Sequence, residues 1–266
     1  MGILNLTPDS FSDGGDLLVA GSDSAVSLPK ALDRARAMLA AGASIIDVGG
    51  ESTRPGADVV SSQQEMDRVF PVIEALSREF DVVISVDTSN PEIIARCADF
   101  GVGLVNDVRA LSRTGAVEAL AQSGLPVCLM HMRGEPVTMQ DQPVYRDVIA
   151  EVKAFLQDRI QVCNKAGIGA DRIMVDPGFG FGKTLMHNVE ILRRLDEFQD
   201  LALPVLIGVS RKSMLGALTG RSAKDRMAGG LAAAVMAVMQ GARIVRTHDV
   251  QETVDALRVA DAVLRT

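Results

Sequence analysis

The sequence predicts a single (β/α)8 barrel, and three observations support this prediction. Eight short apolar runs alternate with longer helical segments, and neither a linker nor a shift in composition separates them. Strands that alternate with helices pair in parallel, and eight such units indicate a closed barrel. Polar side chains follow most of the apolar runs, which in a barrel places them around one mouth. A doubly wound open sheet is the alternative, and it would spread the same side chains along an edge.

The predicted strands are apolar runs that stop at polar or glycine-rich loops. The clearest is Ile173–Val175, which is long enough for a buried strand and too short for a helix, and which stops at Asp176. In chain order the strands are Gly2–Leu6, Ser44–Val48, Val82–Val86, Gly103–Val105, Pro126–Met130, Ile173–Val175, Pro204–Val209 and Arg243–Val245.

A helical segment is predicted after each strand. Pro29 suits the start of the first helix and Gly42 suits its end. The segment after the seventh strand is broken near Gly220. The stretch from Thr7 to about Leu28 is longer than an ordinary strand-to-helix connection, which indicates a functional loop. In chain order the helices are Lys30–Ala41, Ser62–Phe80, Pro91–Asp99, Gly115–Ser123, Val144–Ala166, Asn188–Phe198, Asp225–Met239 and Asp249–Leu264.

Length and composition agree with one domain spanning residues 1–266. The chain is 47% hydrophobic and has the usual size of a single barrel. Its net charge is −7 and it has no basic block, so nucleic acid is not an expected partner. The apolar run Leu231–Met239 is too short to cross a bilayer. Cys97, Cys128 and Cys163 lack metal-ligand spacing and are typical of buried thiols; with no recognisable signal peptide, they predict a cytoplasmic protein.

Four polar residues after predicted strands have the hydrogen-bonding groups to surround a planar heterocycle. The carboxylates of Asp87 and Asp176 accept from ring amine and N–H groups. Asn106 both donates and accepts, and Lys212 donates to a ring carbonyl or nitrogen. The set suits a guanidine-like edge better than a sugar. The alternative is a network of mutually paired charges inside the barrel.

A second set of residues suits an anion. Arginine side chains match phosphate oxygens, hydroxyls add donors, and Asn5 has an oxygen with which to share a Mg²⁺ ion. Ser213 lies where the helix after the seventh strand begins, so its backbone N–H and hydroxyl suit a carboxylate. Helix capping is the alternative use of any single Ser or Thr. The set consists of Asn5, Thr53, Arg54, Ser210, Arg246 and His248.

Two other chemistries have weaker support. Lys212 alone is compatible with a Schiff-base aldolase. His131, His187 and His248 suggest a metal site, but they are scattered and lack close carboxylate partners in the sequence.

Eight motifs, taken in order, resemble those of bacterial dihydropteroate synthases. They span almost the whole chain, and together they are highly specific, whereas each alone is weak. The motifs lie at Met1–Gly15, Ile45–Gly56, Ile84–Ser89, Asn106–Asp107, Leu129–Met132, Asp176–Lys183, Gly208–Ser213 and Arg246–Asp249.

The resemblance implies a (β/α)8 transferase of folate biosynthesis. Its substrates would be 6-hydroxymethyl-7,8-dihydropterin diphosphate and 4-aminobenzoate, and its products 7,8-dihydropteroate and pyrophosphate. Mg²⁺ would assist, and Asn5 would bind it. Sulfonamides, which mimic aminobenzoate, would be inhibitors. The resemblance also implies a homodimer, for which the small-residue helix Gly229–Met239 offers a close-packed interface.

The same resemblance assigns the site residues by substrate. The pterin would contact Asp87, Asn106, Asp176 and Lys212, with Met130 and Arg246 on its faces. The diphosphate would contact Asn5, Arg246 and His248. The aminobenzoate would contact Thr53, Arg54, Pro55, Phe181, Lys212 and Ser213, with Phe11 and Asp13 of the first loop closing over it.

The implied catalytic residues are Asp87, Lys212, Arg246 and His248. Arg246, His248 and Mg²⁺ would stabilise the departing diphosphate. Asp87 would stabilise the cation that forms as the bond breaks. The amine of aminobenzoate then attacks, so Lys212 is not required to form a covalent bond.

The chain departs from the family pattern in two places. It begins at the first strand, where family members have a preceding hairpin, and its first loop is longer around Leu17–Ser27. Three rival interpretations stay open: a pterin-dependent methyltransferase barrel, a Schiff-base lyase and an inactive pterin-binding paralogue. The first-loop motif and the run from Ser210 to Ser213 favour the synthase.

Overall fold

The structure is a computed structural model that describes residues 1–7, 17, 26–52, 60–134, 138–141 and 143–264. Within these ranges eight strands alternate with helices. The strands are β1 (Gly2–Asn5), β2 (Ile45–Gly49), β3 (Val83–Asp87), β4 (Leu104–Asp107), β5 (Val127–Met130), β6 (Ile173–Asp176), β7 (Leu206–Ile207) and β8 (Ile244–Val245). The α-helices are α1 (Leu28–Ala40), α2 (Ser62–Glu79), α3 (Pro91–Cys97), α4 (Ala116–Ser123), α5 (Val148–Lys165), α6 (Leu185–Arg193), α7 (Ser213–Thr219), α8 (Met227–Met239) and α9 (Val250–Leu264).

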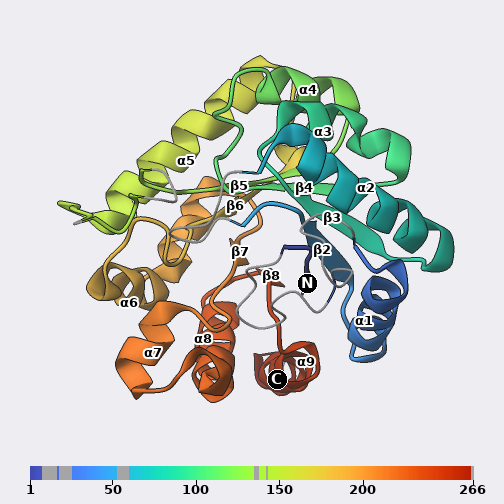
Figure 1. Ribbon diagram of the computed structural model, residues 1–266. Coiled ribbons are helices and arrows are strands. Elements are labelled where there is room, and N and C mark those ends of the chain that lie inside the picture. The colour runs from blue at the N-terminus through green and yellow to red at the C-terminus, as the bar shows by residue number, and fades with distance from the viewer. Residues whose placement is uncertain (8–16, 18–25, 53–59, 135–137, 142, 265–266) are drawn as a thin grey trace.

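The strands close into a barrel. β1 to β6 pair in parallel in chain order, and β7 pairs in parallel with β8. Two isolated parallel bridges join the sets, Val175 with Val205 and Gly2 with Thr247. At the second bridge the amide of Thr247 donates to the carbonyl of Met1 at 3.0 Å. Figure 1 shows the strands around a common centre with the helices as an outer ring. The predicted (β/α)8 fold is therefore confirmed, and the open doubly wound sheet is wrong.

Three predicted elements differ from the structure in their extent. α5 begins at Val148 rather than Val144, because the Asp147 side chain accepts from the amides of Ile149 and Ala150. The segment predicted as one helix over Asn188–Phe198 is divided into α6 and a 3-10 helix, η3 (Leu195–Leu201). β7 and β8 are only two residues long, so much of the predicted strand length is irregular backbone.

The interiors of the strands and the inner faces of the helices form the core. Around β1–β3 it is built from fully buried side chains such as Leu4, Ile46 and Ile73. Around β4–β8 it includes Phe179 and Phe198. The predicted buried thiols are confirmed, because Cys97, Cys128 and Cys163 are all free and buried. Burial of these apolar side chains fixes the strands, and so fixes the positions of the polar residues at their ends.

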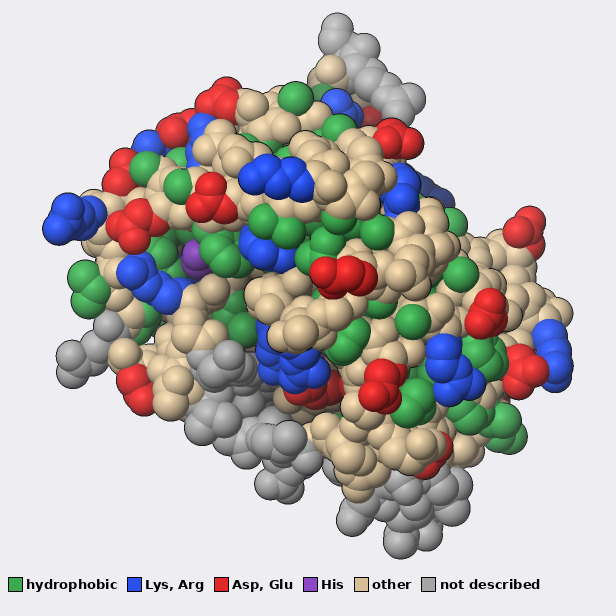
Figure 2. All heavy atoms as spheres, turned by 90° about the horizontal axis from the view of Figure 1, so that it is seen from above, with side chains coloured by type: hydrophobic (Ala, Val, Ile, Leu, Met, Phe, Trp, Pro, Cys, Tyr) green, Lys and Arg blue, Asp and Glu red, His purple; other side chains and the backbone are tan. Residues whose placement is uncertain are grey.

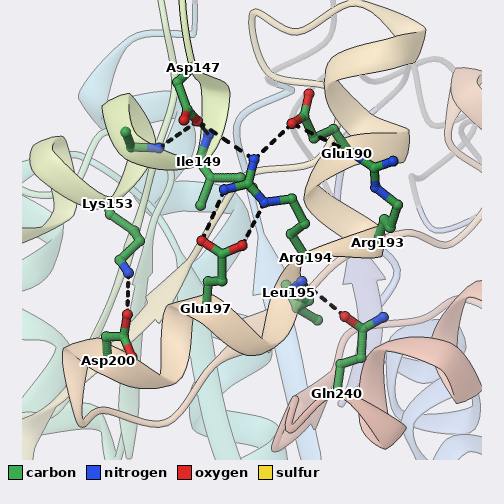
Figure 3. A network of polar contacts seen from close by, with 11 residues as sticks. Asp147, Ile149, Lys153, Glu190, Arg193, Arg194, Leu195, Glu197, Asp200 and Gln240 are labelled. Carbon is green, nitrogen blue, oxygen red and sulfur yellow. Dashed lines mark hydrogen bonds and ion pairs between the residues drawn. The ribbon is translucent and has the colours of Figure 1, made fainter.

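Polar contacts tie the outer helices together between α5, α6 and η3 (Figure 3). The Arg194 guanidinium donates to Glu190 at 2.9 Å and to both carboxylate oxygens of Glu197 at 2.6 and 3.1 Å. Lys153 donates to Asp200 at 2.5 Å. These contacts join outer elements of the barrel to one another.

The exposed charges do not segregate by sign on the face that Figure 2 shows. Side chains of Lys, Arg, Asp and Glu are interspersed there among hydrophobic ones. Among the helices of the described residues, none is both long and apolar enough to cross a membrane.

Candidate active site

A cavity of about 610 Å³ lies at the carboxyl ends of the strands. Sites for small molecules in proteins commonly measure about 300–1,000 Å³, so this one has room for two small ring systems. Eleven predicted site residues line it, and one of them is Ser210 of the predicted anion set. The other ten are Asn5, Asp87, Asn106, Met130, Asp176, Phe181, Lys212, Ser213, Arg246 and His248.

The convergence of these residues follows from the fold. In a barrel of parallel strands every carboxyl end points to the same mouth. Asn5, Asp87 and Asp176 are the last residues of their strands, and Arg246 directly follows β8. The other predicted site residues, Phe11, Asp13, Thr53, Arg54 and Pro55, lie outside the described residues.

Asp47 organises the floor of the cavity, and the sequence reasoning did not single it out. It lies within β2 and is fully buried. Its carboxylate accepts from Arg246 Nε and from Ser85 Oγ, both at 2.6 Å, and from Asn106 Nδ2 at 3.3 Å. The signal available in the sequence was a charged residue inside an apolar run, because a buried carboxylate requires partners.

Arg246 joins two carboxylates. Besides its bond to Asp47, its NH2 group donates to Asp87 Oδ2 at 2.9 Å. Burial raises the pKa of Asp87, and the Arg246 guanidinium opposes that rise. Burial lowers the pKa of Arg246, but the carboxylates of Asp47 and Asp87 outweigh it and the net shift is upward. Arg246, Asp47 and Asp87 thus form the network of paired charges that the sequence left open as an alternative. This network fixes the Arg246 guanidinium at the cavity.

Asp176 has a different environment. Its Oδ1 accepts from the amide of Gly178 at 2.7 Å. Burial raises the pKa of Asp176 to about 6, opposed by that hydrogen bond and by the nearby charges of Lys212, Lys183 and Arg246. A carboxylate in this setting changes its charge near neutral pH, which is a property of many ligand-binding groups.

The loops after β6 and β7 meet at the cavity. Lys212 Nζ lies 4.1 Å from the centre of the Phe181 ring, a cation–π contact. Ser213 is the first residue of α7. These three side chains form one wall, with an aromatic face, a cation and a hydroxyl.

The loops after β7 and β8 hold each other. His248 Nδ1 lies 3.0 Å from Ser210 Oγ, and the His248 amide donates to the same oxygen at 3.2 Å. Arg211 forms an ion pair with Asp249. This double connection keeps His248 and Arg246 beside the Lys212 loop.

The scattered histidines do not form a metal site. Among the described residues, no cluster of three His, Cys, Asp or Glu side chains is arranged to hold a metal ion. His131 is buried and lies beside Lys183 rather than beside His248.

Two side-chain oxygens lie near Gly49, a donor type that Mg²⁺ takes in proteins. A Cβ placed on Gly49 would lie 3.6 Å from Asn5 Oδ1 and 3.8 Å from Asp87 Oδ2, so two oxygen-bearing side chains flank this glycine. Mg²⁺ commonly takes one or two protein oxygens and completes its shell with phosphate and water.

Comparisons with known proteins agree with the geometry. The family model described as "Pterin binding enzyme" matches residues 1–248. Dihydropteroate synthase of Escherichia coli K12 is 54% identical over 264 residues, which cover 99% of this chain and 91% of that protein. The chain belongs to the dihydropteroate synthase family. The resemblance seen in the motifs is thereby confirmed.

Two solved structures extend the comparison. Dihydropteroate synthase of Yersinia pestis in a sulfonamide drug complex has a TM-score of 0.94 and 50% identity, covering all of this chain and 93% of that one. The Xanthomonas albilineans synthase with 4-aminobenzoic acid has a TM-score of 0.90 and 45% identity, with coverage of 100% and 93%. Both sequence identities are far above the range in which structural similarity shows a shared fold alone.

Several cavity residues of this family member were not predicted individually. Glu51 lines the cavity and pairs with Arg109 at 3.2 Å, which ties the loop after β2 to the loop after β4. Arg226 also lines it and donates to the carbonyl of Arg211 at 3.1 Å. Charged residues in loops give no sequence signal of their own, because most such residues are solvated.

Proposed function

We propose that this chain condenses 6-hydroxymethyl-7,8-dihydropterin diphosphate with 4-aminobenzoate to give 7,8-dihydropteroate and pyrophosphate. The observation that carries the proposal is the convergence of the eleven predicted residues on one cavity. They provide carboxylates and an amide for a pterin edge, cations for a diphosphate, and an aromatic wall for aminobenzoate.

The pterin site is formed by Asp176, Asn106 and Lys212, with Met130 and Arg246 on the ring faces. Asp176 accepts from the amine and N–H groups of the ring. Asn106 is oriented by its bond to Asp47 at 3.3 Å. The fixed Arg246 plane offers a flat surface for ring stacking.

The reaction begins with cleavage of the bond between the pterin methylene carbon and the diphosphate oxygen. The electron pair leaves with the diphosphate, whose charge Arg246 and His248 stabilise. The cation left on the methylene and ring is stabilised by Asp87. The amine nitrogen of aminobenzoate then forms the new C–N bond and loses a proton. These reaction steps need no covalent enzyme intermediate. Lys212 therefore acts as a hydrogen-bond donor and as part of the wall of the cavity.

Asn5 and Asp87 would hold Mg²⁺ together with the diphosphate oxygens. When bound, the ion neutralises charge on the leaving group. The flanking of Gly49 by oxygens of both side chains supports this assignment.

The aminobenzoate site lies against Phe181, Lys212 and Ser213, with Thr53, Arg54, Pro55, Phe11 and Asp13 assigned to it by the family motifs. Sulfonamides are then expected to compete with aminobenzoate. The test is formation of dihydropteroate, identified by mass, at varied sulfonamide and aminobenzoate concentrations. A rise in the apparent KM for aminobenzoate at constant kcat is expected, whereas inhibition that excess aminobenzoate cannot reverse would contradict the shared site.

A homodimer is part of the proposal. α7, α8 and α9 lie next to one another on one side of the barrel (Figure 1). Their exposed apolar side chains form one surface, called here the apolar surface of α7–α9. A second copy of the chain would cover this surface. Its residues are Leu218, Met236, Met239, Val259 and Val263.

A further inference from the structure

The loop of residues 177–184 carries one wall of the cavity and folds closely over the end of β5. Gly178 and Gly182 have φ angles of +71° and +64°. A Cβ on Gly178 would lie 1.9 Å from the carbonyl oxygen of His131, and one on Gly182 would lie 2.3 Å from that of Arg133. Only glycine tolerates both the angle and the approach. The backbone path of this loop is therefore set by contact with the segment that directly follows β5.

A single buried amine holds this path from inside. Lys183 is 3% exposed. Its Nζ donates to the carbonyls of Gly178 at 2.8 Å, Phe181 at 3.0 Å and His131 at 3.3 Å, and it lies 2.9 Å from His131 Nδ1. One nitrogen thus joins both ends of the turn to the end of β5.

The surrounding groups suit a donor at this position. Burial, followed by the charge of Lys183, lowers the pKa of His131 to about 2, so the imidazole is neutral and its Nδ1 can accept a hydrogen bond. Burial lowers the pKa of Lys183 to about 7, with Asp176 opposing. Both protonation states of the amine have N–H groups to donate.

Other polar contacts hold the outside of the same loop. The amide of Gly180 donates to Asn188 Oδ1 at 2.7 Å, and Tyr145 donates to the carbonyl of Gly182 at 2.9 Å. Gln140 donates to the carbonyl of Gly180. Lys183 differs from these because it reaches the carbonyl of Phe181, the residue whose ring faces Lys212.

Lys183 itself does not line the cavity, whereas Asp176, Gly180 and Phe181 do. We propose that Lys183 is a positioning residue for the aminobenzoate site, because it fixes the peptides of Gly178 and Phe181 and so the Phe181 ring. The carboxylate of Asp176 accepts from the Gly178 amide and lies near the Lys183 charge, but its backbone belongs to β6, so its position depends less on Lys183 than that of Phe181 does. Removal of the amine then displaces the aminobenzoate wall more than the pterin site. This inference rests on the proposed reaction.

The test compares steady-state kinetics of Lys183→Met and the wild type for each substrate. We expect the KM for aminobenzoate to rise about tenfold and the KM for the pterin diphosphate to change less than about threefold, because a displaced wall weakens most the substrate that rests on it. Lys183→Gln keeps two N–H donors, so its KM for aminobenzoate is expected to lie between those of the wild type and Lys183→Met. It replaces Lys183→Met in the test if the Met variant does not fold.

Arg172→Met is the matched control. Arg172 directly precedes the first residue of β6. Like Lys183, it is a cationic side chain that donates to backbone carbonyls, here those of Leu120 at 3.0 Å and Leu125 at 2.8 Å. It lies away from the cavity. Its loss should lower stability and leave both KM values within about twofold of the wild type. A Lys183 variant that behaves as Arg172→Met does, losing stability alone, overturns the inference.

A double-mutant cycle with Phe181→Ala separates positioning from general disruption. If Lys183 acts through the Phe181 ring, adding Lys183→Met to Phe181→Ala should raise the KM for aminobenzoate less than about twofold further. If the increase in the KM for aminobenzoate in the double variant equals the product of the increases in the two single variants, the inference is overturned. A wild type without any synthase activity would instead contradict the proposed reaction, so the two failures are distinguishable.

Discussion

Asp87 and Asp176 are two buried carboxylates in one cavity with different partners. Asp87 is paired with Arg246 at 2.9 Å, and Asp176 is held by the amide of Gly178 at 2.7 Å. Asp87 therefore pairs directly with the cation that would stabilise the leaving group, whereas Asp176 accepts from a peptide amide and has the charges of Lys212 and Lys183 nearby. This difference supports the proposed roles, Asp87 at the breaking bond and Asp176 in recognition of the ring.

Asn substitutions should separate these roles. Asp87→Asn is expected to lower kcat by about 10² or more with a small change in the pterin KM, because it removes a charge needed at the transition state. Asp176→Asn should mainly weaken pterin binding, measured by calorimetry with a pterin alone. Similar effects of both changes on binding and on turnover would contradict the assignment.

Pterin binding should depend on pH through Asp176. Its pKa is raised to about 6, so the carboxylate is ionised above that pH and protonated below it. Since the ionised form accepts from the ring, the affinity should fall by up to about tenfold per pH unit as the pH drops below about 6. In Asp176→Asn this dependence should disappear; its persistence would point to another titrating group.

Some features of individual site residues could be predicted from the sequence and others could not. Polar residues at strand ends were predictable, because every parallel strand delivers its last side chain to the same mouth. Which charges pair was not predictable, since Arg246 and Asp47 lie 199 positions apart in the chain. Lys183 was visible in a motif, but its role depends on carbonyls that only the folded loop brings together.

At the scale of elements, helix starts depend on single caps. Asp147 Oδ1 accepts from the amides of Ile149 and Ala150 at 3.0 Å each (Figure 3). The sequence prediction placed the start of this helix four residues too early, at Val144, because the apolar pattern continues before the cap. Boundaries of this kind are decided by one hydrogen-bonding side chain rather than by periodicity.

Asp147→Ala should lower the free energy of unfolding by about 1 kcal/mol, because two amides at the start of α5 lose their acceptor. Asp147→Asn, which keeps a side-chain oxygen, is the control and should lose less. The measurement is urea denaturation, with both KM values expected to stay at the wild-type level. A change in KM equal to that of a cavity variant would mean that α5 influences the site.

At the scale of the whole molecule, the barrel was predictable from the count and alternation of its units. Closure itself depends on short contacts, such as the amide of Thr247 with the carbonyl of Met1 at 3.0 Å, which no local pattern indicates. The two-residue strands β7 and β8 likewise left a weak signal.

The apolar surface of α7–α9 provides a test of assembly. Met236 is 52% exposed, and Met236→Glu should shift the protein from dimer to monomer in sedimentation, because a buried interface would have to desolvate the carboxylate. Val144→Glu, at a site that is 71% exposed and outside α7–α9, is the control and should leave the dimer intact. A wild type that sediments as a monomer, or a Met236→Glu protein that stays dimeric, would contradict this interface.

The most direct measurement of the central claim is pyrophosphate release from 6-hydroxymethyl-7,8-dihydropterin diphosphate with Mg²⁺, with and without 4-aminobenzoate. The expected result is release that depends on aminobenzoate and matches the dihydropteroate formed mole for mole. Tight binding of the pterin without release, under either condition, would contradict the proposed reaction and indicate a pterin-binding protein that lacks the chemistry.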